Sequence, residues 1–244
     1  MRICAVLGAC GGLGRSVVQR LLDAGDFVFL LDLEHCRAEA QPVLAGASGA
    51  RAAFLACDLG EPHSIAAAFA EIANRGPLAA LVNAAGVIRR APFLDMAAAE
   101  LEALCAVNIT GSFLALQHAA RLMAAGGGGR IVNIASVHGL RTAGERSAYA
   151  MSKGAMLALT RALAVELAAQ HILVNAVAPG PVAAGMQHAE SEARRQWLAA
   201  TPLGRVATAD EIANAAAFLA SPANTFITGE TLLIDGGASA RIAG

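Results

Sequence analysis

Short apolar runs alternate with helical segments along the chain, and this alternation limits the folds that the chain can adopt. The runs expected as strands span residues 3–7, 27–31, 52–56, 79–82, 131–135, 172–177 and 231–234. Helical composition and spacing occur between them, at residues 16–24, 92–123, 154–170 and 210–219. Strands that alternate with helices favour a parallel sheet with helices on both faces. We therefore predict an α/β protein with one doubly wound parallel sheet, and a single domain over residues 1–244, because the composition shows no break.

The overall composition excludes several classes of protein. The 244 residues suffice for a large core, and the formal net charge of -1 gives no electrostatic reason to bind nucleic acid or an anionic membrane. No apolar run reaches the length of a membrane span, and the first residues lead into a strand and glycines, unlike a signal peptide. The five cysteines form no Cys-x-x-Cys pair, which predicts reduced thiols, a cytoplasmic location and no metal site: Cys4, Cys10, Cys36, Cys57 and Cys105.

Glycines follow the first predicted strand and precede the first predicted helix. They are Gly8, Gly12 and Gly14, with Leu13 between the last two. A glycine-rich turn between strand and helix lets the backbone approach a pyrophosphate, and the first N–H groups of the helix point at it. The spacing differs from the commonest dinucleotide fingerprint, and a glycine cluster alone can be only a tight turn. Its place in the first strand–turn–helix unit favours dinucleotide binding.

Acidic residues follow the second and third predicted strands. Asp32 stands where a carboxylate accepts hydrogen bonds from the adenosine ribose and repels a 2′-phosphate, so it predicts NAD in preference to NADP. An aspartate there could instead only cap a turn, and nearby Arg37 weakens the NAD prediction. Asp58 has two interpretations of equal weight: it approaches the adenine, or it caps a helix that starts near Glu61.

Small and polar residues follow the fourth predicted strand, in the order Asn83-Ala84-Ala85-Gly86. Their small side chains would let the backbone lie along a cofactor. Farther along, Asn108 lies inside an apolar helical stretch, where burial of its amide is costly unless it is hydrogen-bonded. Asn108 is therefore either a structural polar residue or part of a proton path.

The most informative side chains are Tyr149 and Lys153. They lie four residues apart, and so on one face of a helix, and they are the only tyrosine and the only lysine of the chain. An ammonium near a phenol stabilises the phenolate, which predicts a tyrosine pKa below the usual value of about 10 and a role as general acid or base. Ser136 closes the fifth apolar run, where its hydroxyl could hydrogen-bond a substrate oxygen. Tyr-x-x-x-Lys also arises by chance in many helices, as a tyrosine beneath a solvated lysine.

Taken in order, these motifs resemble those of the short-chain dehydrogenase/reductase family, and the resemblance covers essentially the whole chain. Two further motifs of the family are Pro179-Gly180 and Asp235-Gly236-Gly237. The resemblance implies a Rossmann-type sheet with NAD along its carboxyl edge. It also implies an enzyme that interconverts a secondary alcohol and a ketone by direct hydride transfer, without a metal.

The resemblance implies roles for individual residues as well. The implied catalytic tetrad is Asn108, Ser136, Tyr149 and Lys153, with Tyr149 as the proton donor or acceptor. Family members usually form homotetramers, which here would pair the helices that carry Asn108 and Tyr149. The implied cofactor contacts, besides Tyr149 and Lys153, are Gly8, Gly12, Leu13, Gly14, Asp32, Leu33, Cys57, Asp58, Leu59, Asn83, Ala84, Ala85, Gly86, Pro179, Gly180 and Val182.

Two positions depart from the family pattern. Leu7 stands where the glycine motif usually opens with threonine, so we expect packing to hold the turn. Ala184 stands where the family often has a threonine near the nicotinamide amide. The segment 183–200 around this position is polar and irregular, and we expect it to form a lid over the site.

The substrate and the exact activity stay open at this point. Basic residues that follow the predicted site motifs, and that would suit either an anionic substrate or the protein surface, are Arg89, Arg90, His138 and Arg141. One rival function is an NADPH-dependent 3-oxoacyl reductase of the same family, which Asp32 disfavours. Another is a non-catalytic dinucleotide sensor, which the intact tetrad disfavours, because a sensor needs only the binding half.

Overall fold

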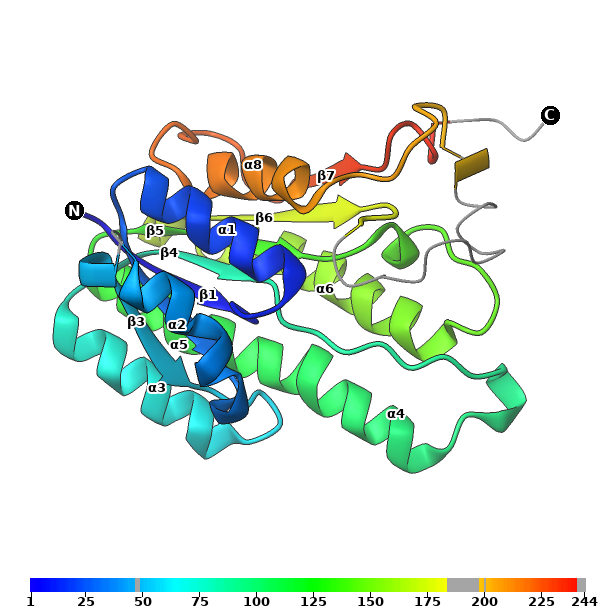
Figure 1. The fold of residues 1–244 in the computed structure, drawn as a ribbon, viewed down its shortest axis with the longest axis horizontal. Coiled ribbons are helices and arrows are strands. Elements are labelled where there is room, and N and C mark those ends of the chain that lie inside the picture. Colours follow the sequence, from blue (N-terminus) through cyan, green and yellow to red (C-terminus); the bar gives the residue numbers. More distant parts are fainter. Residues whose placement is uncertain (47–48, 184–197, 200, 241–244) are drawn as a thin grey trace.

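Seven parallel strands form one sheet, in the order β3-β2-β1-β4-β5-β6-β7 (Figure 1). The computed structural model describes residues 1–46, 49–183, 198–199 and 201–240. Each predicted strand agrees with an observed strand to within two residues at either end, and the doubly wound parallel sheet is confirmed. The strands are β1 (Ile3–Leu7), β2 (Phe27–Asp32), β3 (Ala52–Ala56), β4 (Leu78–Asn83), β5 (Gly129–Ile134), β6 (Ile172–Pro179) and β7 (Thr231–Ile234).

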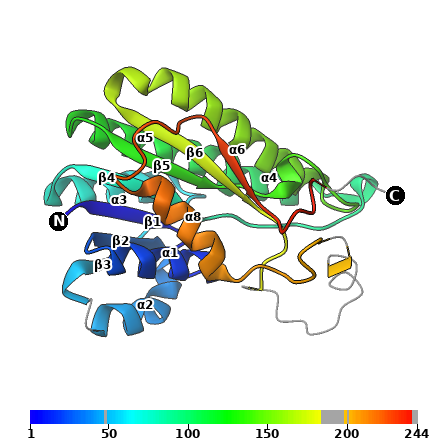
Figure 2. The same ribbon diagram turned by 90° about the horizontal axis from the view of Figure 1, so that it is seen from above.

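Helices cover both faces of this sheet (Figures 1 and 2). One face packs against α1 (Gly12–Asp23), α2 (Arg37–Ala45) and α8 (Ala209–Ala220). The other face packs against α3 (Pro62–Arg75), α5 (Ser112–Ala125) and α6 (Ser147–Glu166). A further helix, α4 (Ala98–Cys105), continues through a π-helical segment, Ala106–Gly111, into α5. Single 3₁₀ turns lie at Glu34–Cys36, Gly49–Arg51, Phe93–Asp95, Val137–Gly139 and Ala168–Gln170.

The side chains of β1 explain why helices lie on both faces. Cys4 and Val6 pack into the cluster formed with α1 and α8, whereas Ala5 and Leu7 pack into the cluster formed with α3 and α5. All four are buried. A strand that is apolar on both sides is stable only between two helix layers. Burial of a valine or leucine contributes about 1.5–3 kcal/mol, so these layers are the main source of stability.

The strand order reverses between β1 and β4. From β1 the chain builds outward to β3 and then returns to place β4 on the other side of β1. In open α/β sheets, ligands bind beyond the carboxyl ends of the strands at such a reversal. The loops that follow β1 and β4 both leave the sheet at this edge, and a functional site is therefore expected between them.

One helical run passes a test of length and composition for a membrane span. It extends from Ala98 to Ala125 and includes α4 and α5. Its α5 part packs on the sheet through side chains that are almost fully buried, namely Ala115, Leu116, Ala119 and Met123. This packing is typical of a core helix with one apolar face.

Candidate active site

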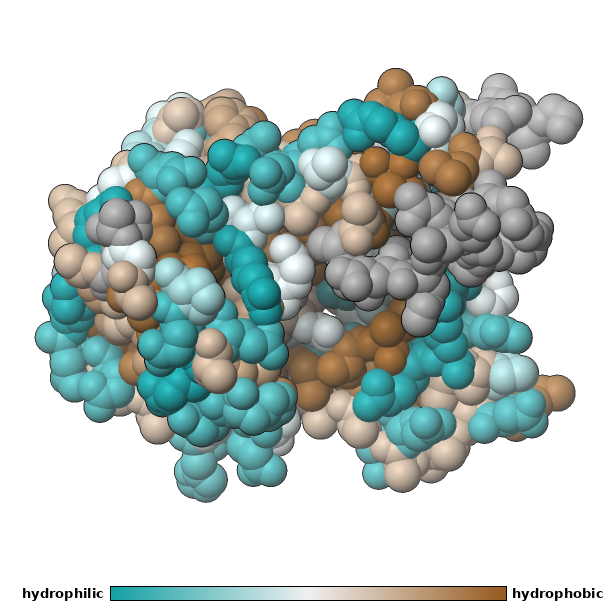
Figure 3. All heavy atoms as spheres, in the orientation of Figure 1, coloured by the Kyte–Doolittle hydropathy of each residue, from teal (hydrophilic) through white to brown (hydrophobic). Residues whose placement is uncertain are grey.

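Two adjoining cavities lie at the carboxyl edge of the sheet. The first has a volume of about 320 Å³ and the second of about 350 Å³. Both are lined by Ala84, Ala85, Gly86 and Val87, so the loop after β4 forms their shared wall. The surface is visibly hollowed in this region (Figure 3). We call the first the catalytic cavity and the second the acidic cavity, after the side chains described below.

The glycine loop between β1 and α1 is close-packed against the loop after β4. Gly8 has φ +70°, and a Cβ atom on it would lie 2.7 Å from the Cα of Ala85. A Cβ atom on Gly14 would lie 2.0 Å from the carbonyl oxygen of Gly8. Only glycine fits either position. The first turn of α1 has no side-chain cap, so its N–H groups are available to a phosphate.

The loop does not need the threonine that Leu7 replaces. Leu7 is buried in the core, as predicted. Backbone hydrogen bonds also hold the turn, since the N–H groups of Gly8 and Ala9 donate to the carbonyl oxygen of Leu31 at 2.9 and 3.3 Å. The prediction that packing alone replaces the hydroxyl is therefore incomplete.

Asp32 ties the glycine loop to the end of β2. One carboxylate oxygen accepts the N–H of Cys10 at 2.8 Å, and the other accepts the N–H of Leu33 at 2.8 Å. Asp32 and Leu33 both line the acidic cavity. The carboxylate therefore stabilises a turn, as the first alternative for Asp32 states, and its contact with a cofactor ribose stays a prediction.

Three carboxylates line the acidic cavity, and the nearby arginines are paired with carboxylates. In the part of the chain that the structure describes, the lining includes Asp32, Asp58 and Glu39 but no arginine or lysine. Arg15 forms an ion pair with Glu39. Arg37 donates to both carboxylate oxygens of Glu34, at 2.6 and 2.8 Å, and its guanidinium stacks 4.6 Å from the ring centre of Phe54. Sequence reasoning missed Glu39, whose helix position gives no signal of the cavity.

Asp58 faces the acidic cavity and does not cap a helix. It lines the cavity next to Leu59. Its carboxylate accepts the N–H of Gly60 at 2.8 Å, within its own turn. Helix α3 begins at Pro62 without a side-chain cap, so the capping alternative is wrong.

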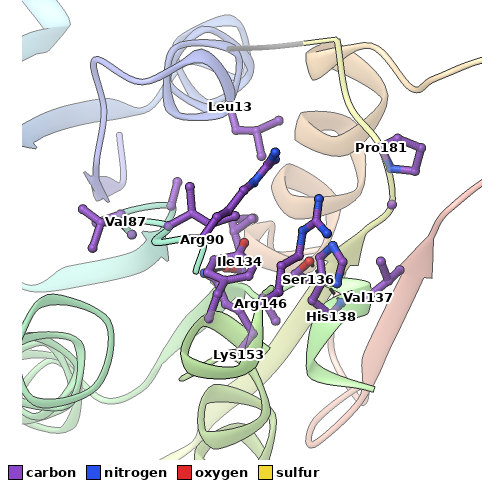
Figure 4. Close-up of a pocket in the computed structure, with 17 residues that line it drawn as sticks. Leu13, Val87, Arg90, Ile134, Ser136, Val137, His138, Arg146, Lys153 and Pro181 are labelled. Carbon is purple, nitrogen blue, oxygen red and sulfur yellow. Dashed lines mark hydrogen bonds between the residues drawn. The ribbon is translucent and has the colours of Figure 1, made fainter. Parts of the chain in front are cut away.

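Ser136, Tyr149 and Lys153 all line the catalytic cavity. Figure 4 shows Ser136 and Lys153 in its wall. Ser136 follows β5, and its hydroxyl oxygen accepts the N–H of His138 at 3.2 Å. Tyr149 and Lys153 both project from α6, which begins at Ser147, earlier than the predicted start at residue 154. Leu13, Gly180 and Pro181 line the same cavity from other loops.

Lys153 is buried and points at the sheet. Only 4% of it is exposed, and its Nζ atom donates to the carbonyl oxygen of Ile134 at 2.9 Å. The same atom lies 5.8 Å from the centre of the Tyr149 ring. Burial lowers the pKa of Lys153 to about 8, so the ammonium form persists at neutral pH at a cost in stability.

The pKa of Tyr149 is raised, and the prediction that it is lowered is wrong for this structure. Burial of the phenol is the largest cause. A hydrogen bond with Ser136 and the positive charge of Arg146 act in the opposite direction. The reason for the error is that Lys153 donates to Ile134 and not to the phenol.

Asn108 joins the loop after β4 to α6. Its amide oxygen accepts the N–H of Val87, and its amide nitrogen donates to the carbonyl oxygen of Val87, both at 2.8 Å. The nitrogen also donates to the hydroxyl of Ser152 at 3.1 Å. Asn108 lies in the π-helical segment, and a Cβ atom on Gly86 would be 3.4 Å from both Asn108 and the Nζ of Lys153. These contacts favour the structural interpretation of its amide.

Basic side chains enter the catalytic cavity from two loops. Arg90, Arg146 and His138 line it, whereas Arg89 and Arg141 do not. Burial, followed by the positive charges of Arg146 and Arg90, lowers the pKa of His138 to about 4. Sequence reasoning missed Arg146. The available signal was its place three residues before Tyr149, at the start of the same helix.

Comparisons with known proteins agree with this geometry. A family model described as Enoyl-(Acyl carrier protein) reductase matches residues 8–239. Galactitol 2-dehydrogenase (L-tagatose-forming) from Cereibacter sphaeroides is 39% identical over 238 residues, covering 96% of this chain and 93% of that protein. A 3-oxoacyl-(acyl-carrier-protein) reductase from Aquifex aeolicus is 36% identical over 239 residues, covering 97% of this chain and 96% of that protein. Gluconate 5-dehydrogenase from Burkholderia cenocepacia, solved with NADP and tartrate, has a TM-score of 0.92 at 32% identity and covers 99% of this chain and 96% of its own.

The chain belongs to the short-chain dehydrogenase/reductase family. The protein is therefore an NAD(P)-dependent dehydrogenase or reductase that acts on hydroxyl or keto groups. The residues present fit a dinucleotide of this kind. The uncapped first turn of α1 offers N–H groups to a pyrophosphate, and the narrow approach of Gly8 to Ala85 leaves room only for backbone.

Not every residue expected to contact the cofactor in this short-chain dehydrogenase lines a cavity. Cys57 and Asn83 are buried, and the amide atoms of Asn83 have no hydrogen-bond partner among the described residues. Val182 pairs with Ala207 in an isolated bridge. The expected contacts that line neither cavity are Gly12, Gly14, Cys57, Asn83, Pro179 and Val182.

The segment predicted as a lid lies mostly outside the described residues. Within 183–200, only residues 183, 198 and 199 are described. Ala184, the second departure from the family pattern, is outside as well. Among the described residues, no group of three or more histidines, cysteines or acidic residues could hold a metal ion.

Proposed function

We propose that the protein is an NAD-dependent oxidoreductase that interconverts a secondary alcohol and a ketone. The observation that carries this proposal is the continuity of the two cavities. Tyr149, Ser136 and Lys153 line one of them, Asp32 lines the other, and the backbone from Ala84 to Gly86 is common to both. A nicotinamide dinucleotide bound along this edge supplies or accepts the hydride.

In the proposed mechanism, Tyr149 exchanges the proton of the substrate oxygen. Because its pKa is raised, the phenol is protonated at neutral pH and can donate to a ketone oxygen. Ser136 donates a hydrogen bond that orients the same oxygen. Lys153 would hold the nicotinamide ribose, and the positive charge of Arg146 favours loss of the proton from Tyr149 during alcohol oxidation. Asn108 positions α6 against the loop after β4. A water-mediated proton relay would pass behind Lys153.

The acidic cavity supports NAD over NADP. A 2′-phosphate there would meet the carboxylates of Asp32 and Glu39, a repulsion that a partly desolvated site strengthens. The two arginines that could attract it, Arg15 and Arg37, are each paired with a carboxylate. The similar gluconate 5-dehydrogenase was solved with NADP, so NADP is the alternative that needs testing.

We also propose a homotetramer in the cytoplasm, with residues 1–244 acting as one domain. Exposed apolar side chains on α5 and α6 support the assembly, since Phe113, Met151 and Val165 are 46%, 49% and 80% exposed. Contact through these helices would pair the same surface of two copies, as two-fold symmetry requires. Size measurement by light scattering tests it.

A kinetic experiment tests the proposed activity. Reduction of NAD and of NADP is followed with a panel of secondary alcohols, for wild type and for Tyr149→Phe. The substitution should lower kcat by about a thousandfold or more and leave NADH affinity within about threefold. Retention of a tenth of the wild-type turnover would contradict the role of Tyr149.

The alternative functions give different results in the same assay. The relative from Aquifex aeolicus supports an NADPH-dependent 3-oxoacyl reductase. That enzyme would favour NADPH and reduce a 3-oxoacyl thioester faster than any simple ketone. A non-catalytic sensor would bind the dinucleotide with no turnover of any substrate.

A further inference from the structure

The basic side chains of the catalytic cavity are not explained by the proposed chemistry. Hydride and proton transfer at a secondary alcohol need Tyr149, Ser136 and Lys153, but they do not need Arg90 or Arg146. Both arginines nevertheless line the cavity from opposite loops, one after β4 and one before α6. In Figure 4 the Arg90 side chain extends towards Leu13, and the Arg146 side chain lies nearer Ser136 and His138.

The positive charge of Arg90 acts unfavourably on the guanidinium of Arg146. The pKa of Arg146 is lowered, first by burial and then by the positive charge of Arg90. Among the described residues, the lining of the catalytic cavity contains no aspartate or glutamate that would offset this repulsion. Glu145 raises the pKa of Arg146, but it is exposed and does not line the cavity.

Carboxylates neutralise the charge of several other arginines in the described chain. Arg2, Arg15, Arg20, Arg37 and Arg205 form ion pairs with carboxylates. Neither Arg90 nor Arg146 takes part in an ion pair between described residues. For Arg146 the described hydrogen bond of the side chain is to the carbonyl oxygen of Gly144, at 3.2 Å. The pair thus presents N–H donors and positive charge to whatever occupies the cavity.

We infer that the substrate carries an anionic oxygen group, with a carboxylate as the best match, which Arg90 and Arg146 bind while its carbinol carbon lies at Ser136 and Tyr149. A guanidinium offers a planar fork of donors that matches two carboxylate oxygens. Apolar walls from Val87, Ile88 and Val137 would enclose the carbon skeleton between the two ends. The inference rests on the proposed function, because it names the substrate class of that site.

A pair of matched probes tests the inference without turnover. Cyclohexanecarboxylate and its uncharged twin, cyclohexanecarboxamide, are titrated into the protein by calorimetry, with and without saturating NADH. Wild type should bind the carboxylate at least about tenfold more tightly than the amide, and this ratio should fall with added salt. Equal affinity of the two probes overturns the inference.

Substitutions identify the residues responsible. Arg90→Gln and Arg146→Gln should each lower carboxylate affinity about tenfold and amide affinity by less than about threefold. Arg89→Gln is the matched control, since Arg89 and Arg90 are both exposed but only Arg90 lines the cavity. If the two variants weaken NADH binding and leave the probe ratio unchanged, the arginines serve the cofactor phosphates and the inference is wrong.

Turnover of the corresponding alcohols separates this inference from the proposed function. The substrates are 4-hydroxycyclohexanecarboxylate and its carboxamide, with NAD. Oxidation of both at equal kcat/KM, with no preference in binding, supports the proposed function and overturns the inference. Preferential binding of the carboxylate that the two arginine variants abolish, with no oxidation of either alcohol, supports the inference and counts against the proposed function.

Discussion

The two cavities share one wall but have opposite charge. The described lining of the acidic cavity contains Asp32, Glu39 and Asp58 and no arginine or lysine. The described lining of the catalytic cavity contains Lys153, two arginines and a histidine and no aspartate or glutamate. The change of sign takes place across the short loop from Ala84 to Val87. We therefore expect an elongated ligand to bind in one direction only. Its neutral, hydroxyl-rich end would lie in the acidic cavity, and its other end would lie beside the cations of the catalytic cavity.

The two cavities also differ in how their charges are held. The carboxylates of the acidic cavity lie at the ends of strands or on exposed helix surface, and Asp32 accepts two backbone N–H groups. Lys153, in contrast, is buried and has a lowered pKa. Asp32 in the acidic cavity thus stabilises the neighbouring loops. The buried charge of Lys153 in the catalytic cavity lowers the free energy of unfolding.

Lys153→Met should give the largest effect and should separate activity from stability. We expect kcat/KM to fall by about a hundredfold or more, because the ammonium is lost from the site. At neutral pH the free energy of unfolding should rise by about 1–3 kcal/mol, because a buried charge is removed. Urea denaturation followed by circular dichroism measures the second effect.

The sign of this stability effect depends on pH. The pKa of Lys153 is about 8 in the folded state, against 10.5 for an ordinary lysine. The unfolded chain therefore binds more protons between these values, and wild-type stability should rise relative to the variant from about pH 8 to about pH 10.5. Lys153→Arg, which keeps a charge, should show no gain at neutral pH. A constant difference between wild type and Lys153→Met over this range would contradict the burial of a charged lysine.

Asp32→Asn should change coenzyme preference while leaving the loop in place. The amide keeps one acceptor oxygen for the backbone N–H groups but carries no charge. We expect the ratio of kcat/KM for NAD over NADP to fall by about tenfold or more. Asp32→Ala, which loses both acceptors, should also lower stability by about 1–2 kcal/mol. An unchanged ratio in both variants would show that Asp32 does not face the 2′ position.

Glu39→Gln should give a smaller change in the same direction. It removes one carboxylate from the acidic cavity and releases Arg15 from its ion pair. A free guanidinium there can attract a 2′-phosphate, although exposure and salt weaken the effect. We expect kcat/KM with NADP to rise about two- to fivefold. Glu34→Gln is the control, since Glu34 pairs with Arg37 but does not line the cavity.

The smallest effect is a titration of Tyr149 that needs no substrate. As the chain has a single tyrosine, tyrosine labelled with ¹³C at the ring carbon bonded to oxygen gives one resonance. In the ligand-free protein its midpoint should lie above the usual pKa of about 10, because burial dominates. Arg146→Gln should move the midpoint higher, and Arg141→Gln should not. A midpoint below the usual value would contradict this expectation and would support the lowered Tyr149 pKa that the sequence predicts.

The sequence alone predicted the sheet and the main polar groups of the site. Strands that are buried on both faces are apolar along their whole length, so a single sequence predicts them. A glycine without room for a Cβ atom cannot be replaced, so its position can also be predicted from one sequence. The sequence could predict one site for Ser136, Tyr149 and Lys153, because the topology brings the end of β5 and the start of α6 to the same edge of the sheet. The resemblance to a known family then supplied their roles.

The rest depends on distances that a sequence does not contain. The direction of the Tyr149 pKa is set by burial and by the choice of Ile134 as the partner of Lys153. The entry of Arg146 into the catalytic cavity depends on the path of the loop before α6. Asn108 in the π-helical segment hydrogen-bonds to Val87 and Ser152, which come from distant parts of the chain.

The burial of the only lysine has a consequence for proteolysis. A protease that cuts only after lysine has a single target bond in this chain, between Lys153 and Gly154. That bond lies within α6, and a folded helix does not fit the extended binding cleft of a protease. Cleavage into two fragments therefore requires α6 to open, and its rate at low protease concentration measures the free energy of that local opening. The protein thus contains its own reporter for the stability of the helix that carries Tyr149.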